Sequence, residues 1–179
     1  MTPLPAVFDI TPGMEQAWRD LPKPKATSAD IAMLEGALDT TLPPSDVEFV
    51  SHHGFVAFGR DPEGRCVFQY TIEAGGRVEM REGDISFLFR PEKLLQVHRY
   101  MISIESLDDE ARPMIPPGYL AVGSDAGHGC ILLDIAARPG QVWYWRDRAS
   151  RWGLDANVAL GVFADDFEGF INGQRSDRP

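Results

Sequence analysis

Cysteine is scarce in this sequence, and long apolar runs are missing. The 179 residues include only two cysteines, Cys66 and Cys130, and both lie within short apolar runs. Such cysteines are typical of small core side chains in a reducing compartment, so no disulfide framework is predicted. No apolar stretch approaches the roughly 20 residues that a membrane helix needs, and the N-terminus has no signal-peptide pattern. We therefore expect a cytoplasmic protein.

Basic side chains are also few, which argues against several classes of partner. Lys and Arg number 17 against 27 Asp and Glu, for a net charge of -10 and a pI of about 4.8. DNA, RNA and anionic membranes bind basic surfaces, so we expect none of them as a partner. A basic protein partner is favoured, because opposite charges speed encounter. The alternative is that the negative charge only keeps the protein soluble and attracts no partner.

The remaining composition is that of a globular protein with one domain. Hydrophobic residues make up 44% and charged residues 25% of the chain, which is ordinary for a folded domain of this length. Residues 1–26 contain five prolines and no sustained periodicity. We predict an extended N-terminal arm there, with a short helical stretch at residues 14–21 that Trp18 anchors. Residues 27–179 are predicted to form a single domain.

Four segments have helical signals. Thr27 or Ser28 can cap the first, which has an apolar stripe at residues 31, 34 and 38. The two prolines at residues 43–44 end that helix and begin a second, which Gly54 is placed to terminate. A third helix begins at Pro91. The last is predicted at residues 165–171, with Phe167 and Phe170 facing inward and Asn172-Gly173 ending it in a left-handed turn.

Strand signals lie between these helices. The segment 65–72 alternates, with Cys66, Phe68, Tyr70 and Ile72 on one face. Residues 55–59 and 85–89 are predicted to be further short strands, with turns at 61–64 and 75–76. Residues 119–122, 130–135 and 141–145 are predicted to form an antiparallel meander, separated by glycine-rich turns. This order of elements predicts an α+β fold with a central, mainly antiparallel sheet and helices packed against it.

Histidine and cysteine residues suggest a metal or a thiol enzyme only weakly. The adjacent His52 and His53 would point about 100° apart on a helix, so they cannot easily share a metal. His128 and Cys130 share a face of an extended chain, yet no further ligands complete a zinc set. Cys130 or Cys66 could also act as a nucleophile with His128 and Asp125. The alternative is an unreactive core cysteine, because buried free cysteines are common. We therefore predict no metal, no cofactor and no catalytic residues.

The glycine-rich segment 123–129 resembles a phosphate-binding loop only superficially. It matches neither the dinucleotide nor the Walker pattern, and it leads into a strand rather than a helix. We interpret it as a hairpin turn in which Asp125 bonds local amides.

Aromatic and acidic side chains are the candidates for partner contacts. Strand alternation places Trp143 and Trp145 on one face, followed by Arg146 and Arg148. Exposed tryptophan with arginine is a frequent interface anchor, while core packing and base stacking are the alternatives. The acidic segment 105–110 is a second candidate. The predicted partner-binding residues are Glu105, Asp108, Asp109, Glu110, Asp125, Trp143 and Trp145.

Three segments together resemble the SUKH superfamily, the group around the Smi/Knr-type cell-wall assembly regulators. The first, residues 30–54, has an amphipathic helix with Glu35, then Leu42-Pro43 and a glycine-terminated turn at Gly54. The second, residues 119–135, has strand, Gly-Ser-Asp, a glycine-rich turn and strand. The third joins the aromatic strand 142–147 to the closing helix 166–170.

This resemblance implies an α+β fold and a non-catalytic, protein-binding role. Many bacterial members look like immunity proteins that neutralise a cognate toxin, and others are regulatory or scaffold proteins. An immunity-type protein with a basic toxin domain as its partner is therefore our first hypothesis. A regulator or scaffold of the same fold without a toxin partner is the second, and a thiol- or metal-dependent enzyme is the third.

Overall fold

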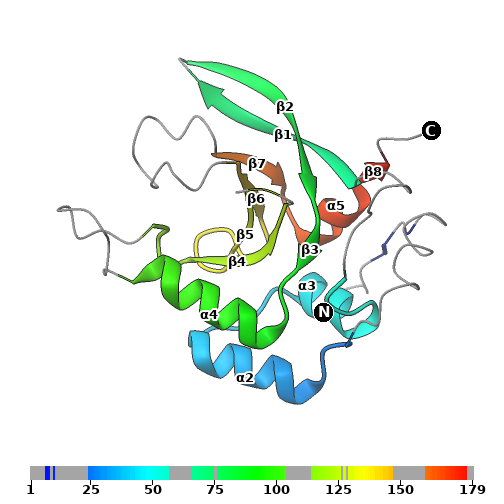
Figure 1. Ribbon diagram of the computed structural model, residues 1–179, viewed down its shortest axis with the longest axis vertical. Coiled ribbons are helices and arrows are strands. Elements are labelled where there is room, and N and C mark those ends of the chain that lie inside the picture. The colour runs from blue at the N-terminus through cyan, green and yellow to red at the C-terminus, as the bar shows by residue number, and fades with distance from the viewer. Residues whose placement is uncertain are drawn as a thin grey trace.

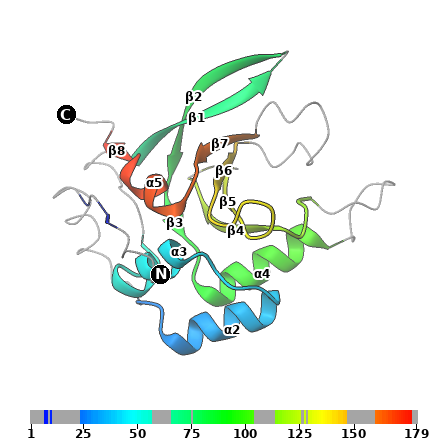
Figure 2. The same cartoon turned by 180° about the vertical axis from the view of Figure 1, so that it is seen from behind.

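The computed structural model describes residues 7–8, 10, 24–56, 66–74, 76–103, 114–125, 127, 129–146 and 160–176. In these residues a curled antiparallel sheet has helices packed around it, which confirms the predicted α+β class (Figure 1). Three helices gather at one end of the molecule, and a long hairpin projects from the other end (Figure 2).

The sheet is antiparallel throughout the described strands. Its order is β2-β1-β7-β6-β5-β4-β3, and β8 pairs with the start of β1. The predicted meander is confirmed as β4, β5 and β6. The strand bounds are β1 Cys66–Ala74, β2 Arg77–Ile85, β3 Phe87–Leu88, β4 Tyr119–Ser124, β5 Cys130–Asp134, β6 Val142–Trp145, β7 Leu160–Ala164 and β8 Arg175–Ser176.

The four predicted helices are present, with bounds α2 Ser28–Leu38, α3 Pro44–His52, α4 Pro91–Ile102 and α5 Phe167–Asn172. Thr27 is the N-cap of α2. Its hydroxyl accepts from the Asp30 amide at 3.2 Å, and the Asp30 carboxylate accepts from the Thr27 amide at 2.8 Å. This capping box satisfies two amides that the first turn would leave without partners. Gly54 follows α3 with φ of 83°, the left-handed conformation that glycine tolerates.

Aromatic side chains fill the inside of the curled sheet. The Tyr144 ring on β6 packs at 5.0 Å from Phe68 and 4.9 Å from Tyr70, both on β1. A Cβ atom at Gly83 on β2 would lie 2.8 Å from the Phe68 ring and 2.9 Å from Tyr144. At Gly161 on β7, a Cβ atom would collide with the carbonyl oxygen of Thr71. Glycine at these two positions therefore permits the tight curl.

The structure also corrects the sequence prediction. Residues 77–84 belong to a strand that was not predicted, and β7 was missed although it lies between β1 and β6. The short strand expected at 85–89 is the end of β2 followed by β3, and residues 55–56 are not in a strand. Gly173 ends α5 with φ of -80°, a right-handed rather than a left-handed turn. The expected helix at 14–21 with Trp18, residues 57–59 of the expected strand and the turn at 61–64 lie outside the described residues.

Candidate functional site

The acidic cluster expected to contact a partner lies outside the described residues. This holds for Glu105, Asp108, Asp109 and Glu110, and for His128. Their partner-binding role stays a prediction. Of the predicted partner-binding residues, the structure describes Asp125, Trp143 and Trp145. It also describes Cys66, Cys130, His52 and His53, which the sequence offers as metal or thiol candidates.

Asp125 holds the glycine-rich turn between β4 and β5. Its Oδ1 accepts from the amides of Gly127 at 2.7 Å and Gly129 at 2.9 Å. Its Oδ2 accepts from the hydroxyl of Tyr144 at 2.7 Å. A Cβ atom at Gly129 would collide with this carboxylate, so the turn requires glycine there. The local amide bonds predicted for Asp125 are thus present.

The turn also connects to the sheet through Tyr144, whose pKa is strongly raised. Burial raises the pKa of the Tyr144 hydroxyl well above its usual range, and the hydrogen bond to Asp125 raises it further. Tyr144 therefore stays neutral over the ordinary pH range, and its hydroxyl donates a hydrogen bond to the Asp125 side chain. Asp125 is itself buried, so in this conformation its carboxylate is occupied by the turn and the tyrosine.

Trp143 and Trp145 have different surroundings despite their shared face. Trp145 is 1% exposed and belongs to the core. Trp143 is half-buried, with its ring 6.0 Å from that of Tyr119 and its Nε1 donating to the Gln141 Oε1 at 3.1 Å. Of the two, only Trp143 presents part of its ring at the surface.

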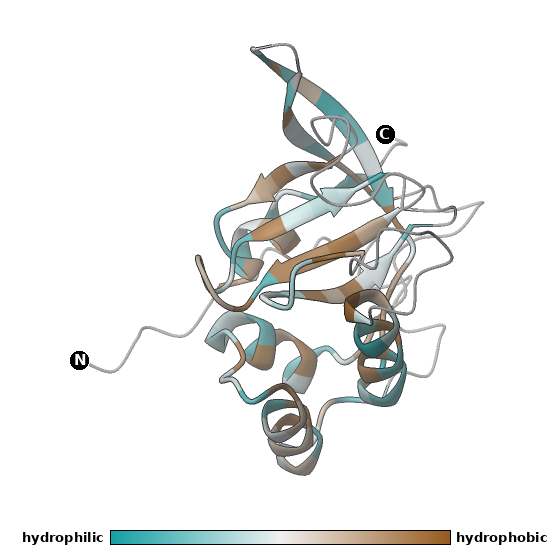
Figure 3. Ribbon diagram, turned by 90° about the vertical axis from the view of Figure 1, so that its left-hand side faces the viewer, coloured by the Kyte–Doolittle hydropathy of each residue, from teal (hydrophilic) through white to brown (hydrophobic). Residues whose placement is uncertain are grey.

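The β1–β2 hairpin carries two strongly exposed apolar side chains. Val78 and Met80 of β2 are 76% and 66% exposed. The register pairs Val78 with Glu73 and Met80 with Thr71, which puts all four on the same face of the hairpin. We call this the outer face, because Phe68, Tyr70 and Ile72 of β1 point to the opposite, buried side. Figure 3 shows hydrophobic and hydrophilic residues side by side along this hairpin.

A pocket of about 160 Å³ lies where the hairpin meets β7. It lies beside the pair that Thr71 of β1 forms with Val162 of β7. Its lining consists of Gln69, Tyr70, Thr71, Met80, Val162, Phe163, Ala164 and Asp165. The pocket therefore combines apolar walls with a carboxylate at one side.

Comparison with known proteins identifies the family. The model of the SMI1 / KNR4 family (SUKH-1) matches residues 25–173. The chain belongs to the SMI1 / KNR4 family. Among curated proteins, none matches the sequence. The match covers all three segments on which the resemblance to the SUKH superfamily was based, as well as the hairpin and its pocket.

The cysteines of this SMI1 / KNR4 family protein lie in its interior. Cys66 is 6% exposed and Cys130 is fully buried, with its Sγ 3.4 Å from the carbonyl oxygen of Gly123. His52 and His53 diverge: the His52 Nδ1 lies 2.9 Å from the Glu48 carbonyl oxygen, whereas the His53 ring packs 5.1 Å from Phe49. In the described part of the chain, no three His, Cys, Asp or Glu side chains are grouped as metal ligands. No helix there is long and apolar enough to cross a membrane.

The burial of the Asp46 carboxylate in this SUKH-1 fold was not predicted. Asp46 lies in the first turn of α3 and is 7% exposed. It lines a small apolar cavity between the helices and the sheet together with Leu34, Leu94 and Val122. Burial raises the pKa of its carboxyl from 3.8 to about 7. Aspartate is mostly exposed in folded proteins, and its place in a first turn is explained by the helix dipole, so the sequence contained no signal for this burial.

Proposed function

We propose that this SMI1 / KNR4 family protein is a non-catalytic protein-binding module that neutralises a cognate bacterial toxin. The observation that carries the proposal is the family match joined to the net charge of -10. Many bacterial relatives in the SUKH superfamily look like immunity proteins, and a strongly acidic chain favours a basic partner. Neutralisation would then come from covering the toxin's active surface.

The surroundings of the thiols and of Asp125 support a binding role over an enzyme. Cys130 is fully buried, and a nucleophilic thiol needs access to its substrate. Asp125 already accepts bonds from two backbone amides and Tyr144, so it is not positioned to orient a catalytic base. Rapid alkylation of one thiol by iodoacetamide in the folded protein at neutral pH would contradict this part of the proposal.

The experiment that tests the function is affinity capture of the tagged full chain from its source cells. The capture should be done at low and at moderate salt, with mass spectrometry of the bound proteins. We expect one basic, toxin-like protein whose recovery falls as salt rises, because salt screens exposed charges. Capture of housekeeping machinery at both salt concentrations would instead favour a regulator or scaffold of the same fold.

A further inference from the structure

We propose that the outer face of the β1–β2 hairpin is the docking surface for a basic polypeptide segment. One apolar side chain of that segment would occupy the pocket between Met80 and Val162. This inference rests on the proposed function and names the surface and the chemistry of the partner.

The strand registers create a continuous row of side chains across this face. Trp143 pairs with Val162, Val162 pairs with Thr71, and Thr71 pairs with Met80. Directly paired residues point to the same side of a sheet, so the row crosses β6, β7, β1 and β2. It begins with the half-buried ring of Trp143 and ends with the side chain of Met80, which is 66% exposed. Exposed methionine and tryptophan side chains are enriched at binding surfaces.

The pocket has room for one apolar side chain. Its volume is about 160 Å³, which is close to the ~150 Å³ of an apolar protein cavity that accommodates benzene. Met80 and Val162 form apolar walls on opposite sides of Thr71. A leucine, isoleucine or phenylalanine side chain of a partner therefore fits the size and the chemistry of the pocket.

The charges around the pocket favour a basic occupant. Asp165 lines the pocket, and Glu73 lies two residues from Thr71 on the same face. Glu82 is also on this face, where Arg175 pairs with it at 2.8 Å. The described outward positions 69, 71 and 73 of β1 and 78, 80 and 82 of β2 hold no Lys or Arg, although Arg175 of β8, opposite Val67, places one cation on this face and offsets Glu82. Glu73 and Asp165 are the carboxylates that favour a basic partner. Opposite charge on a partner would complement this face, whereas a second copy of the chain would bring carboxylates together.

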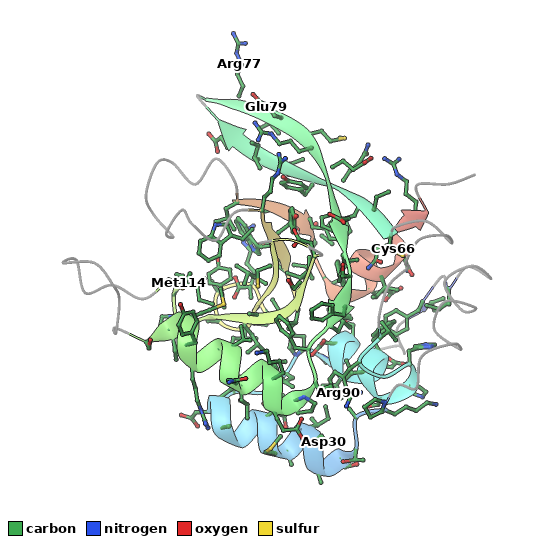
Figure 4. All side chains as sticks on the ribbon, viewed as in Figure 1. Asp30, Cys66, Arg77, Glu79, Arg90 and Met114 are labelled. Atoms are coloured by element: carbon green, nitrogen blue, oxygen red, sulfur yellow. The ribbon has the colours of Figure 1, made fainter. Side chains whose placement is uncertain are left out.

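The sequence of β2 favours binding to its face over pairing with its edge. Five of its nine residues are charged, which is the usual protection of an exposed edge strand against added strands. Two of these, Arg77 and Glu79, extend from the tip of the hairpin (Figure 4). Glu79 pairs with Arg81 at 3.0 Å, also on the side away from the outer face.

The test uses the full chain with ¹³C-labelled methionine methyl groups and a defined peptide. The probe is a seven-residue peptide with six lysines around a central leucine. Two matched peptides replace the leucine by serine or the lysines by glutamates. We expect the leucine peptide to shift the Met80 methyl signal in NMR and to leave the Met33 methyl unchanged, because Met33 is 41% exposed on α2, away from this face. The serine and glutamate peptides should bind at least about tenfold more weakly.

Two variants separate the outer face from general acidity. Met80→Ser should weaken binding of the leucine peptide about tenfold, whereas Met33→Ser should leave it unchanged. An unshifted Met80 methyl at saturating peptide, or equal binding of the leucine and serine peptides, would overturn the proposal. A Met80 signal that depends on protein concentration without peptide would also overturn it, because a second copy would then cover the face.

The captured partner distinguishes failure of the surface from failure of the function. If a toxin is captured and neutralised equally by the wild type and by Met80→Ser, the docking surface is wrong and the proposed function stands. If the leucine peptide binds at Met80 while the captured protein is no toxin, the surface stands and the toxin partner is wrong.

Discussion

Asp46→Asn should change how the stability of the protein depends on pH. The folded-state pKa of Asp46 is raised by burial from 3.8 to about 7. Between these two values the folded state keeps a proton that the unfolded chain has lost. The contribution of Asp46 to the free energy of unfolding is therefore most favourable below about pH 4, and it falls as the pH rises towards 7.

The size of this effect follows from the pKa difference. The shift from 3.8 to about 7 corresponds to on the order of 4 kcal/mol of lost stability above pH 7. About 2 to 3 kcal/mol of that loss falls between pH 5 and pH 8. Asparagine has no charge to bury, so the contribution of this side chain to the free energy of unfolding does not depend on pH. The free energy of unfolding of Asp46→Asn, relative to the wild type, should therefore rise by that amount between pH 5 and pH 8.

Urea unfolding followed by tryptophan fluorescence at pH 5, 6, 7 and 8 measures this difference. Asp39→Asn is the matched control, because Asp39 is exposed at the end of α2 and its replacement removes a carboxylate without changing a buried site. A constant difference between Asp46→Asn and the wild type across this range would refute the reasoning. It would mean that the Asp46 carboxylate is hydrated or paired in the folded protein.

Two further predictions concern the sheet and the turn. Gly83→Ala should destabilise the protein by about 1 to 3 kcal/mol, because its Cβ would lie 2.8 Å from Phe68. Gly36→Ala on α2, with nothing within 4 Å, should be neutral or stabilise by up to about 1 kcal/mol in the same urea titration. Equal changes in the free energy of unfolding for Gly83→Ala and Gly36→Ala would contradict the close packing of the curled sheet around Gly83. Tyr144→Phe removes a donor from the buried Asp125 carboxylate and should cost about 1 to 3 kcal/mol. An unchanged unfolding midpoint would show that this hydrogen bond is dispensable.

Much of the fold could be predicted because local signals agreed with tertiary structure. Thr27 caps α2 as expected, and the alternation of β1 separates buried Phe68 and Tyr70 from exposed Gln69 and Thr71. The meander could be predicted because glycine-rich turns separate apolar strands. In each case the same residues that favour an element locally also bury its apolar side.

In the two strands that were not predicted, β2 and β7, the local sequence signals do not agree with the tertiary structure. Four of the first five residues of β2 are exposed and the fifth is half-buried, since the hairpin extends beyond the sheet, so no apolar alternation marks it. In β7, Gly161 interrupts the pattern because the backbone of β1 approaches it closely. The burial of Asp46 and Trp145 depends on which elements cover them, and this cannot be read from their neighbours in sequence.

The central claim, that the protein neutralises a toxin by binding it, is tested most directly by growth rescue. The basic protein recovered by affinity capture would be expressed in a susceptible bacterium, alone and together with the full chain. The account predicts that growth stops in the first case and resumes in the second, with a one-to-one complex recoverable from the rescued cells. Formation of the same complex without any recovery of growth would contradict it.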